Sequence, residues 1–355
     1  YIIRQDWLDS LNMDKPTTMD ELHDVLKAFK DDKGATDALF IPATGVSDYF
    51  ISAYGVGSGV YLDGDTIKYG PLEDGYQEYL KTMAQWYSEG LLYQDFPFYG
   101  EQLAFRDPGM VGAGQVACFY SETGDMAMFG DFSDDPDILF TAMAPVSLEK
   151  DGTVYMSDKA PSRADDVRWA VTTGCENPEL LISFVDYLYS EEGALLCNYG
   201  IEGEGFTYND AGEPELTGLV LNNPDGIPAR AAMGYFLNPG IPGLIDYTRG
   251  QVVWDDVQRS SIDTWNSAYT GDSMTVSIDA LTLTAEEQDA ISVNLSDMIT
   301  YANEWINGVI FSGNELTEAS IEEFQNTMKD TMHVEDILKV YNDAYERFEA
   351  RSFGA

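Results

Sequence analysis

The chain opens with YIIRQDWLDSL (residues 1–11) and continues, four residues later, with PTTMDEL (residues 16–22). Its first four residues are mostly apolar, as in a buried strand. In the second segment Thr18 and Glu21 have the spacing of a capping box, in which a hydroxyl and a carboxylate satisfy free backbone N–H groups at a helix start. Apolar residues then recur at helical spacing: Leu22, Val25, Leu26 and Phe29. The opening therefore predicts a strand followed by an amphipathic helix.

Further along the chain, short apolar segments alternate with amphipathic ones. Strands are predicted at residues 39–42, 115–120, 138–143 and 167–171, and a hairpin with an Asp-Gly turn at residues 59–67. Helices are predicted at residues 74–90, from about 178 and from about 190 to 199, and over the C-terminal part. Residues 202–250 are rich in Gly, Pro and Asn, which predicts loops with short helices. This alternation is typical of an α/β layer architecture.

The C-terminal part contains two further capping-box patterns. Thr284 with Glu287 predicts a helix start, and the following apolar spacing carries that helix to about Phe311. Ser320 with Glu323 predicts the start of the next helix. A last amphipathic stripe follows at residues 334–348. The end of the chain is therefore expected to be helix-rich.

Size and charge narrow the class of protein. A chain of 355 residues exceeds one core of ordinary size, so two lobes or domains are expected. Hydrophobic residues make up 44% of the chain and aromatic residues 13%, which excludes wholesale disorder. The 62 acidic residues outnumber 19 basic ones, giving a net charge of −43. Such a field repels phosphate backbones and anionic lipid, so no nucleic-acid partner is predicted.

The residues that usually carry metals, redox chemistry and nucleophilic catalysis are scarce. The three cysteines are widely spaced and form no C-x-x-C pair, which argues against a disulfide framework and a thiolate zinc site. Two histidines, His23 and His333, are too few for a histidine-rich metal site, and a Ser–His triad is hard to build. No catalytic residue, metal or cofactor is predicted. No apolar run reaches membrane-spanning length and no signal peptide is evident. Because residues 1–4 look like the middle of a strand, we expect that the chain starts inside a larger protein.

Several motifs carry a resemblance to a known family. The R-x-D-W-L-x-x-L run at residues 4–11 and the P-T-T-x-x-E helix start at 16–21 resemble those of family 1 extracellular solute-binding proteins of bacterial ABC importers. Similar to that family are also YGIEG (residues 199–203), LTAEE (283–287), NGVIFSG (307–313) and VYNDAYERF (340–348). Their order spans essentially the whole chain. They point to the larger lipoprotein-type sugar binders, related in fold to maltose-binding proteins.

The resemblance implies a fold and a domain layout. The fold would be α/β, of the periplasmic-binding-protein type II, with two lobes joined by a hinge and a helix-rich C-terminal part. Residues 1–160 and 245–355 would form the second lobe, and residues 161–244 the remaining part of the first. Family members begin with a further segment of the first lobe that is missing here, so part of the ligand cleft is expected to be absent.

The resemblance also raises the question of calcium. Many relatives carry an EF-hand-like calcium loop after the first helix. Here the stretch DDKGATDA (residues 31–38) is shorter and lacks the Asn ligands and the final Glu. Calcium needs six to eight oxygen ligands, so no calcium site is predicted. A calcium-dependent shift in melting temperature would overturn this expectation.

A sugar site needs ring faces for stacking and a few fixed donors and acceptors. Asp48, Tyr49 and Phe50 follow the strand at 39–42, where related sugar binders place an aromatic residue; packing under the loop is the alternative. Glu122 lies in a strand-to-helix turn of the kind that faces the crevice in open sheets, or it caps the helix. The predicted ligand contacts are Asp48, Tyr49, Phe50, Glu122, Tyr247, Arg249, Trp254 and Trp265. Trp265 has packing within its lobe as its alternative role.

The resemblance implies one function, and two alternatives to it remain open. The chain is expected to capture a carbohydrate, an oligosaccharide, in a cleft between the lobes and to deliver it to ABC transporter permease subunits. It would act as a monomer outside the cell membrane or in the periplasm, held by a lipid anchor that this chain does not contain. One alternative is a secreted glycoside hydrolase, although 62 acidic residues always supply some carboxylate pair. The other is a binder of peptides or polyamines, whose ammonium groups would suit an acidic cleft.

Overall fold

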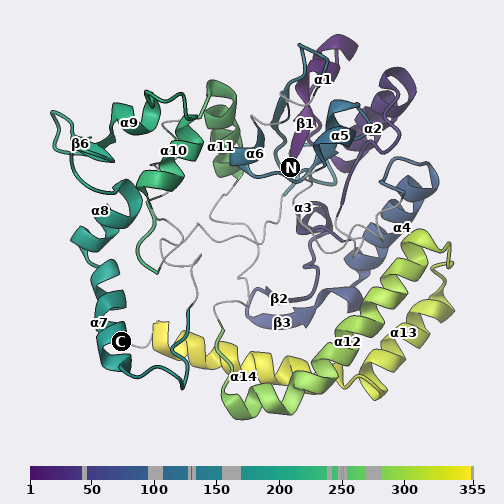
Figure 1. Cartoon of the computed structure of the whole chain (residues 1–355). Coiled ribbons are helices and arrows are strands. Elements are labelled where there is room, and N and C mark those ends of the chain that lie inside the picture. The colour runs from purple at the N-terminus through teal and green to yellow at the C-terminus, as the bar shows by residue number, and fades with distance from the viewer. Residues whose placement is uncertain are drawn as a thin grey trace. The chain divides into compact units, whose positions relative to one another are not determined.

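The computed structural model of the chain describes residues 1–41, 46–94, 107–126, 129, 133–153, 169–237, 242–246, 249, 251, 254–268 and 281–352. Two compact units form (Figure 1). The first joins Tyr1–Asp158 with Ser260–Ala355, and the second is Lys159–Arg259. Each unit has its own cluster of buried hydrophobic side chains. The boundary at residue 260 falls inside helix α11 (Asp256–Ala268).

The first unit contains a three-stranded antiparallel sheet in the order β4-β1-β5. Strand β1 (Ile2–Arg4) is fully buried and pairs on one side with β4 (Cys118–Phe119) and on the other with β5 (Phe140–Ala142). Leu39 adds a parallel bridge to Cys118, so the chain around Leu39 runs in the same direction as β4. The expected opening strand is confirmed.

The four other strand predictions have mixed outcomes. Strands form within 115–120 and 138–143, but they are only two and three residues long. At 39–42 only Leu39 forms bridges, and Pro42 lies outside the described residues. Between 167 and 171 the described residues 169–171 are irregular, so the predicted strand is wrong for them. A strand needs a paired and covered neighbour, and 40% of the Trp169 surface is exposed.

The predicted hairpin is confirmed, with its turn one residue further along. Strand β2 (Val60–Asp63) pairs with β3 (Thr66–Tyr69), and Asp63 lies opposite Thr66. The two-residue loop is therefore Gly64-Asp65, and Gly64 has φ +63°, as hairpin turns of this length require. The open end of the hairpin is closed by the Gly70 N–H, which donates to the Gly59 carbonyl (2.8 Å).

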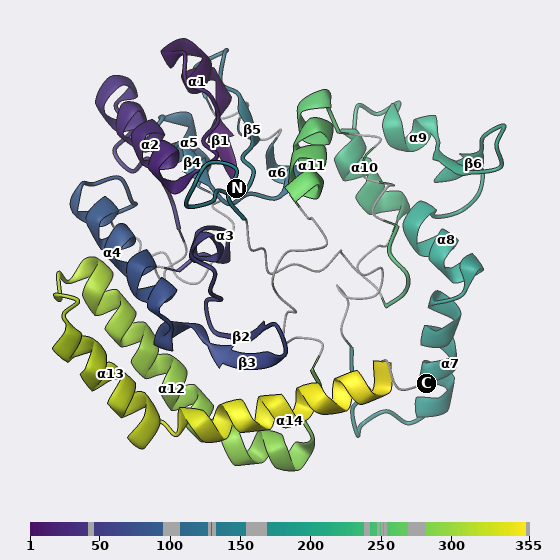
Figure 2. The same ribbon diagram turned by 180° about the vertical axis from the view of Figure 1, so that it is seen from behind.

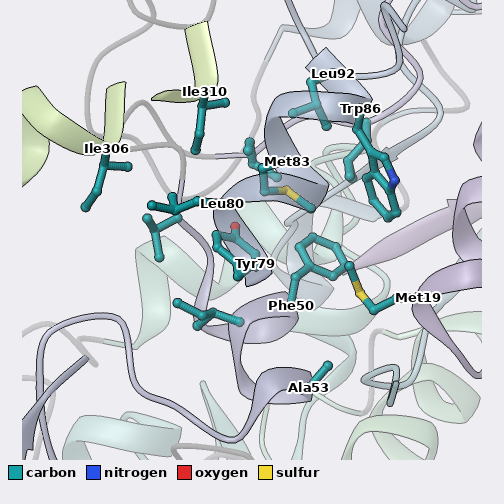
Figure 3. Packing of buried hydrophobic residues seen from close by; sticks show 14 of the residues in the cluster. Met19, Phe50, Ala53, Tyr79, Leu80, Met83, Trp86, Leu92, Ile306 and Ile310 are labelled. Atoms are coloured by element: carbon teal, nitrogen blue, oxygen red, sulfur yellow. The ribbon is translucent and has the colours of Figure 1, made fainter. Parts of the chain in front are cut away.

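Helix α4 (Asp74–Ser88) packs against α12 (Ala285–Phe311) in the first unit, and Figures 1 and 2 show the two helices side by side. Helix α2 (Met19–Lys33) contributes its apolar stripe to the same core. The residues of this core shown in Figure 3 include Met19, Phe50, Tyr79, Leu80, Met83, Trp86, Ile306 and Ile310. The predicted amphipathic helices at 19–29 and 74–90 are therefore confirmed. Their buried side chains belong to the same hydrophobic core as the sheet residues Ile3 and Cys118.

The capping boxes are confirmed at one helix, in part at another and not at the third. At α12, Thr284 and Glu287 form both hydrogen bonds of the box, and the helix ends at Phe311 as predicted. At α2, the Thr18 hydroxyl accepts from the Glu21 N–H (3.1 Å), while the Glu21 carboxylate accepts from Thr17. The predicted box at Ser320 and Glu323 is wrong.

Helix α13 (Glu318–Asp330) starts earlier than the Ser320–Glu323 pattern predicted. Its N-cap is Thr317, and Ser320 takes the third helical position, where its hydroxyl accepts from the Thr317 N–H (2.9 Å). A serine hydroxyl can replace the Glu carboxylate of the usual box because it reaches the same backbone group. Helix α13 is fixed to α12 by Trp305, whose ring stacks on Phe324 at 4.0 Å.

The last helix, α14 (Val334–Ser352), contacts α12, α13 and the hairpin. Its Asn342 side chain accepts from the Ile67 N–H of β3 (3.2 Å). Arg347 donates to both carboxylate oxygens of Glu287 (2.7 and 2.6 Å). Hydrogen bonds from the Thr284 backbone and from Arg347 lower the pKa of Glu287. The short elements that complete the first unit are α1 (Gln5–Leu11), α3 (Asp48–Ile51), α5 (Pro108–Gly112), α6 (Thr123–Met126) and the 3-10 turns η1 (Ser52–Tyr54) and η2 (Gly70–Leu72).

The second unit consists mainly of short helices. Its elements are α7 (Pro178–Leu188), α8 (Glu191–Tyr199), β6 (Phe206–Tyr208), β7 (Pro214–Leu216), α9 (Gly218–Leu221) and α10 (Ala229–Phe236). The two predicted helices around 178–199 are confirmed, and the predicted loop region contains, in addition, the β6–β7 hairpin. A small core is formed by Tyr199, Phe206, Leu216, Val220 and Leu237.

All three cysteines are free thiols, and their surroundings predict different reactivity. Cys118 is fully buried in β4, and burial raises the pKa of its thiol to about 12. Burial also raises the pKa of Cys197. Because the thiolate is the reactive form, the native protein at mildly alkaline pH is expected to hold roughly 10³-fold less thiolate at Cys118 than at an ordinary cysteine. Cys175, which is only half-buried, should react first with a disulfide reagent, as mass spectrometry of the labelled peptides would show.

The control for this labelling is Cys175→Ser, which should remove the fast phase and leave two thiols that react only after unfolding. Rapid labelling of Cys118 in the folded protein would contradict the burial of β4.

Candidate functional site

The ends of three strands converge where β1 begins. Because β1 is antiparallel to both neighbours, Tyr1 lies at the end of β4, which Tyr120 follows, and at the end of β5, which Met143 follows. The Met143 N–H donates to the Tyr1 carbonyl (2.9 Å). The chain around Leu39 runs parallel to β4, so its carboxyl end lies on the same side. In α/β proteins, ligands bind at the carboxyl ends of such parallel strands.

Aromatic rings gather around Tyr1 at this place. The Tyr49 ring lies 5.0 Å from the Tyr1 ring, and the Tyr120 ring lies 6.0 Å from it in an edge contact. Tyr1 is buried, Tyr49 is half-buried, and 38% of Tyr120 is exposed. Tyr1 therefore forms the covered base of the cluster, while Tyr49 and Tyr120 keep part of their surface accessible.

Hydrogen bonds to the main chain fix the Tyr49 and Trp265 rings. The Tyr49 hydroxyl donates to the Met143 carbonyl. From α11, the Trp265 indole N–H donates to the Tyr1 carbonyl (3.3 Å), and the Trp265 side chain is half-buried. With their polar tips bound to carbonyl groups, these rings are held in fixed orientations. Fixed ring faces are what a stacking site for a sugar requires.

Glu122 lies two residues after Tyr120 and is exposed. Its main-chain carbonyl accepts from the Asp125 N–H (2.9 Å) where α6 begins. The neighbouring Ser121 is buried and donates through its hydroxyl to the Glu122 carbonyl (3.3 Å). We refer to Tyr1, Tyr49, Tyr120, Glu122 and Trp265 together as the Tyr1 edge.

The other predicted contacts lie elsewhere in the chain. Arg249, in the second unit, donates to the Asn198 side chain (2.5 Å) and to the Asp246 carbonyl (3.2 Å). Asn198 is buried and also bonds to Leu244, so Arg249 belongs to a polar network that holds this loop to α8. Trp254 is half-buried in the second unit, and its main-chain N–H donates to the Gln251 carbonyl (3.2 Å).

Two of the predicted residues cannot be placed as side chains, and one has a packing role. Tyr247 and the side chain of Asp48 lie outside what the structure describes, although the Asp48 backbone begins α3. Phe50 is completely buried against Tyr1, with ring centroids 4.6 Å apart. Phe50 is therefore a core residue, which agrees with its alternative role of packing under the loop.

The structure thus brings Tyr49 and Trp265 into contact with Tyr1 and places Glu122 two residues after Tyr120, and it adds two residues that sequence reasoning missed. Tyr120 directly follows a buried strand, so the strand-end argument that selected Glu122 also applies to Tyr120. Tyr1 was assigned to a strand interior, and nothing in its local sequence marked it as a meeting point of rings.

In the described part of the chain, no group of three or more His, Cys, Asp or Glu side chains could hold a metal ion. In the loop at 31–38, the Asp37 carboxylate accepts from the Gln94 N–H (3.0 Å) and from the Thr36 hydroxyl (2.7 Å). The absence of calcium at this loop stays a prediction. Of the helices described, none is both long and apolar enough to cross a membrane.

Comparison with protein families gives a match over the first part of the chain. The sequence profile of the family described as bacterial extracellular solute-binding protein matches residues 1–195. Among curated proteins of Bacillus subtilis, Lipoprotein LipO is 26% identical over 62% of this chain, and the polygalacturonan/rhamnogalacturonan-binding protein YtcQ is 26% identical over 57%. The matched regions cover 46% and 42% of those two proteins, so the chain spans less than half of their length.

Solved structures extend the likeness to nearly the whole chain. The alginate-binding protein AlgQ2 without calcium ion has a TM-score of 0.74 and 22% identity, covering 98% of this chain and 71% of that one. The substrate-binding protein FusA of Streptococcus pneumoniae, in complex with kestose, has a TM-score of 0.70 and 18% identity, covering 99% and 72%. Identities this low establish only the fold. The structural similarity confirms the predicted α/β fold of the periplasmic-binding-protein type II.

Proposed function

This chain belongs to the bacterial extracellular solute-binding protein family, and on that premise we propose that it captures a carbohydrate, an oligosaccharide, for an ABC importer. The observation that carries the proposal is the Tyr1 edge, where partly exposed rings are held in fixed orientations at the ends of strands. Ring faces stack on the apolar faces of sugars, while carboxylates and hydroxyls bind sugar hydroxyl groups. The names of AlgQ2, YtcQ and FusA in its complex with kestose, which all refer to carbohydrates, support the same solute class.

Within this proposal the residues have distinct roles. Tyr49, Tyr120 and Trp265 offer ring surface to the sugar, and Glu122 accepts hydrogen bonds from its hydroxyl groups. Tyr1 is a positioning residue, since it is buried beneath the outer rings. Asp48, Tyr247, Arg249 and Trp254 stay predicted contacts, and Phe50 supports the site from the core.

The partners and location follow from the same premise. The chain would deliver its solute to transporter permease subunits, act as a monomer, and work on the outer face of the cell membrane or in the periplasm. The name of the LipO relative supports a lipid anchor on the full-length protein. Membership of a solute-binding family favours capture without catalysis.

The carboxyl groups give the hydrolase alternative no support. A glycoside hydrolase needs an acid whose pKa is raised by an apolar pocket. Among the described residues, Glu21, Glu89 and Glu287 have shifted pKa values, and each is lowered, mainly by hydrogen bonds that stabilise the carboxylate. These three groups are suited to capping and ion pairing rather than to proton donation.

The proposal is tested by thermal unfolding in the presence of oligosaccharides, polyamines and short peptides. A ligand that binds only the folded state stabilises it by mass action, by about 2.7 kcal/mol at a hundred times its Kd. We expect Tm to rise with at least one oligosaccharide and to stay unchanged with polyamines and peptides. A rise in Tm with polyamines alone would show that the solute is a polyamine and not a carbohydrate. Chromatographic detection of shortened oligosaccharides would show that the protein hydrolyses its ligand and does not merely capture it.

A further inference from the structure

We propose that Ser261 is a positioning residue of the Tyr1 edge. Its hydroxyl fixes helix α11 against strand β5, so that the Trp265 ring keeps the orientation that stacking on a sugar requires. This inference rests on the proposed carbohydrate function and adds a residue to its site. Ser261 itself is only 2% exposed, so it acts on the solute through the Trp265 ring and not by contact.

The first attachment of α11 is to the last residue of β5. This strand is the outer one in the order β4-β1-β5, and an outer strand leaves N–H and carbonyl groups without a partner strand. At Ala142 side chains bind both groups. The Ala142 N–H donates to the Ser261 hydroxyl (3.1 Å), and the Ala142 carbonyl accepts from the Lys15 ammonium (2.9 Å). Because the bond to Ser261 is buried, loss of its acceptor would be costly.

The second attachment lies one helical turn further along α11. The Trp265 indole N–H donates to the Tyr1 carbonyl (3.3 Å), which also accepts from the Met143 N–H (2.9 Å). Residues four apart lie on the same face of a helix, about 6 Å from each other along its axis. Ser261 and Trp265 therefore bind one face of α11 to the sheet at two points. Two points fix the rotation of the helix, whereas a single point would allow it to pivot.

These polar bonds carry a large share of the attachment of α11. The main hydrophobic core of the first unit includes none of the described side chains of this helix. Val257 and Ile262 are half-buried, and the two described side chains of α11 that are buried, Gln258 and Ser261, are polar. Gln258 accepts from the Asp255 N–H where the helix begins (3.0 Å). The position of α11 on β5 should therefore depend on the Ser261 hydroxyl.

The Ser261→Ala variant should weaken oligosaccharide binding by about three- to tenfold, because a ring that is not held in its binding orientation must be ordered when the solute binds. Calorimetry with the oligosaccharide that gives the largest Tm rise measures the affinity. The control is Ser267→Ala, which removes the same hydroxyl from an exposed position of α11, where it donates to the Thr264 carbonyl (2.8 Å). The control should bind as tightly as the unaltered protein.

A double-mutant cycle separates positioning from a general loss of structure. In a Trp265→Ala background, Ser261→Ala should have no further effect on affinity, because the ring through which Ser261 acts is gone. An equal loss of affinity with and without the Trp265 ring would overturn the proposal. So would unchanged affinity of Ser261→Ala in a protein that binds an oligosaccharide. If no oligosaccharide binds the unaltered protein, the proposed function falls and the inference falls with it.

NMR of the indole N–H groups tests the attachment without a solute. The chain has six tryptophans, and Trp265→Phe identifies the resonance of Trp265. In the unaltered protein this N–H should exchange with solvent more slowly than that of Trp169, which is 40% exposed. Ser261→Ala should shift the Trp265 resonance and leave those of Trp7 and Trp86, in α1 and α4, unchanged. Faster exchange at Trp265 than at Trp169, or an unmoved Trp265 resonance in the variant, would show that Ser261 does not hold the ring.

Discussion

The Gly70→Ala variant should lose about 3 kcal/mol of unfolding free energy or more, because its new methyl group has no space. A Cβ at Gly70 would lie 1.8 Å from the Gly57 carbonyl oxygen and 3.2 Å from the Tyr76 ring. The first obstacle is backbone, and the second is a fully buried side chain of α4. Neither can move without separating the hairpin from the core. Urea unfolding followed by tryptophan fluorescence measures the loss.

The matched control is Gly59→Ala, at the partner position of the same hairpin end. The Gly59 carbonyl accepts the Gly70 N–H, yet a Cβ at Gly59 would meet no atom within 4 Å. Neither glycine has a positive φ, so backbone strain does not separate the two variants. Gly59→Ala should therefore change stability by well under about 1 kcal/mol. Similar losses in both variants would show that the hairpin end is not packed as described.

The Tyr120→Ala variant should weaken oligosaccharide binding by about 10- to 100-fold while changing stability little. Removal of an aromatic anchor from a binding site typically costs about 1.4–2.7 kcal/mol of binding free energy, which corresponds to that range. The folding cost should be small because 38% of Tyr120 is exposed and it contacts the Tyr1 ring only by an edge. Calorimetry with the oligosaccharide that gives the largest Tm rise measures the affinity.

Two further variants separate stacking from general effects. Tyr120→Phe keeps the ring face and should retain most of the affinity. Tyr208→Ala removes a tyrosine of comparable exposure, 49%, from strand β6 of the second unit and should leave binding unchanged. If Tyr120→Ala binds as tightly as the unaltered protein, the Tyr1 edge is not the sugar platform.

Sequence reasoning was most reliable where a pattern extends over several turns. Helix α12 could be predicted from its first residue to its last because Thr284, Glu287 and a long apolar stripe agree. The strands were harder, because only two or three residues of each are paired, and pairing depends on neighbours more than a hundred residues away. The segment at Trp169 has strand-like composition but no covering layer among the described residues, so composition alone misled.

The candidate site could be predicted only in part, for a related reason. Tyr49 and Phe50 are adjacent in a helix of four residues, which is too short to show an apolar face, so sequence could not tell which ring faces the core. The structure buries Phe50 and leaves Tyr49 half-exposed. The meeting of Tyr1, Tyr120 and Trp265 joins positions up to 264 residues apart in the sequence, and no local pattern encodes it.

The division of the first unit into two stretches has a consequence for how the protein is made. The apolar stripe of α4 emerges from the ribosome long before α12, which covers it, because the second unit is translated in between. About 200 residues separate the end of α4 at Ser88 from the start of α12 at Ala285, so at about 5–20 residues per second they delay closure by about 10–40 s. During that interval the nascent chain cannot complete its main core and stays open to chaperones.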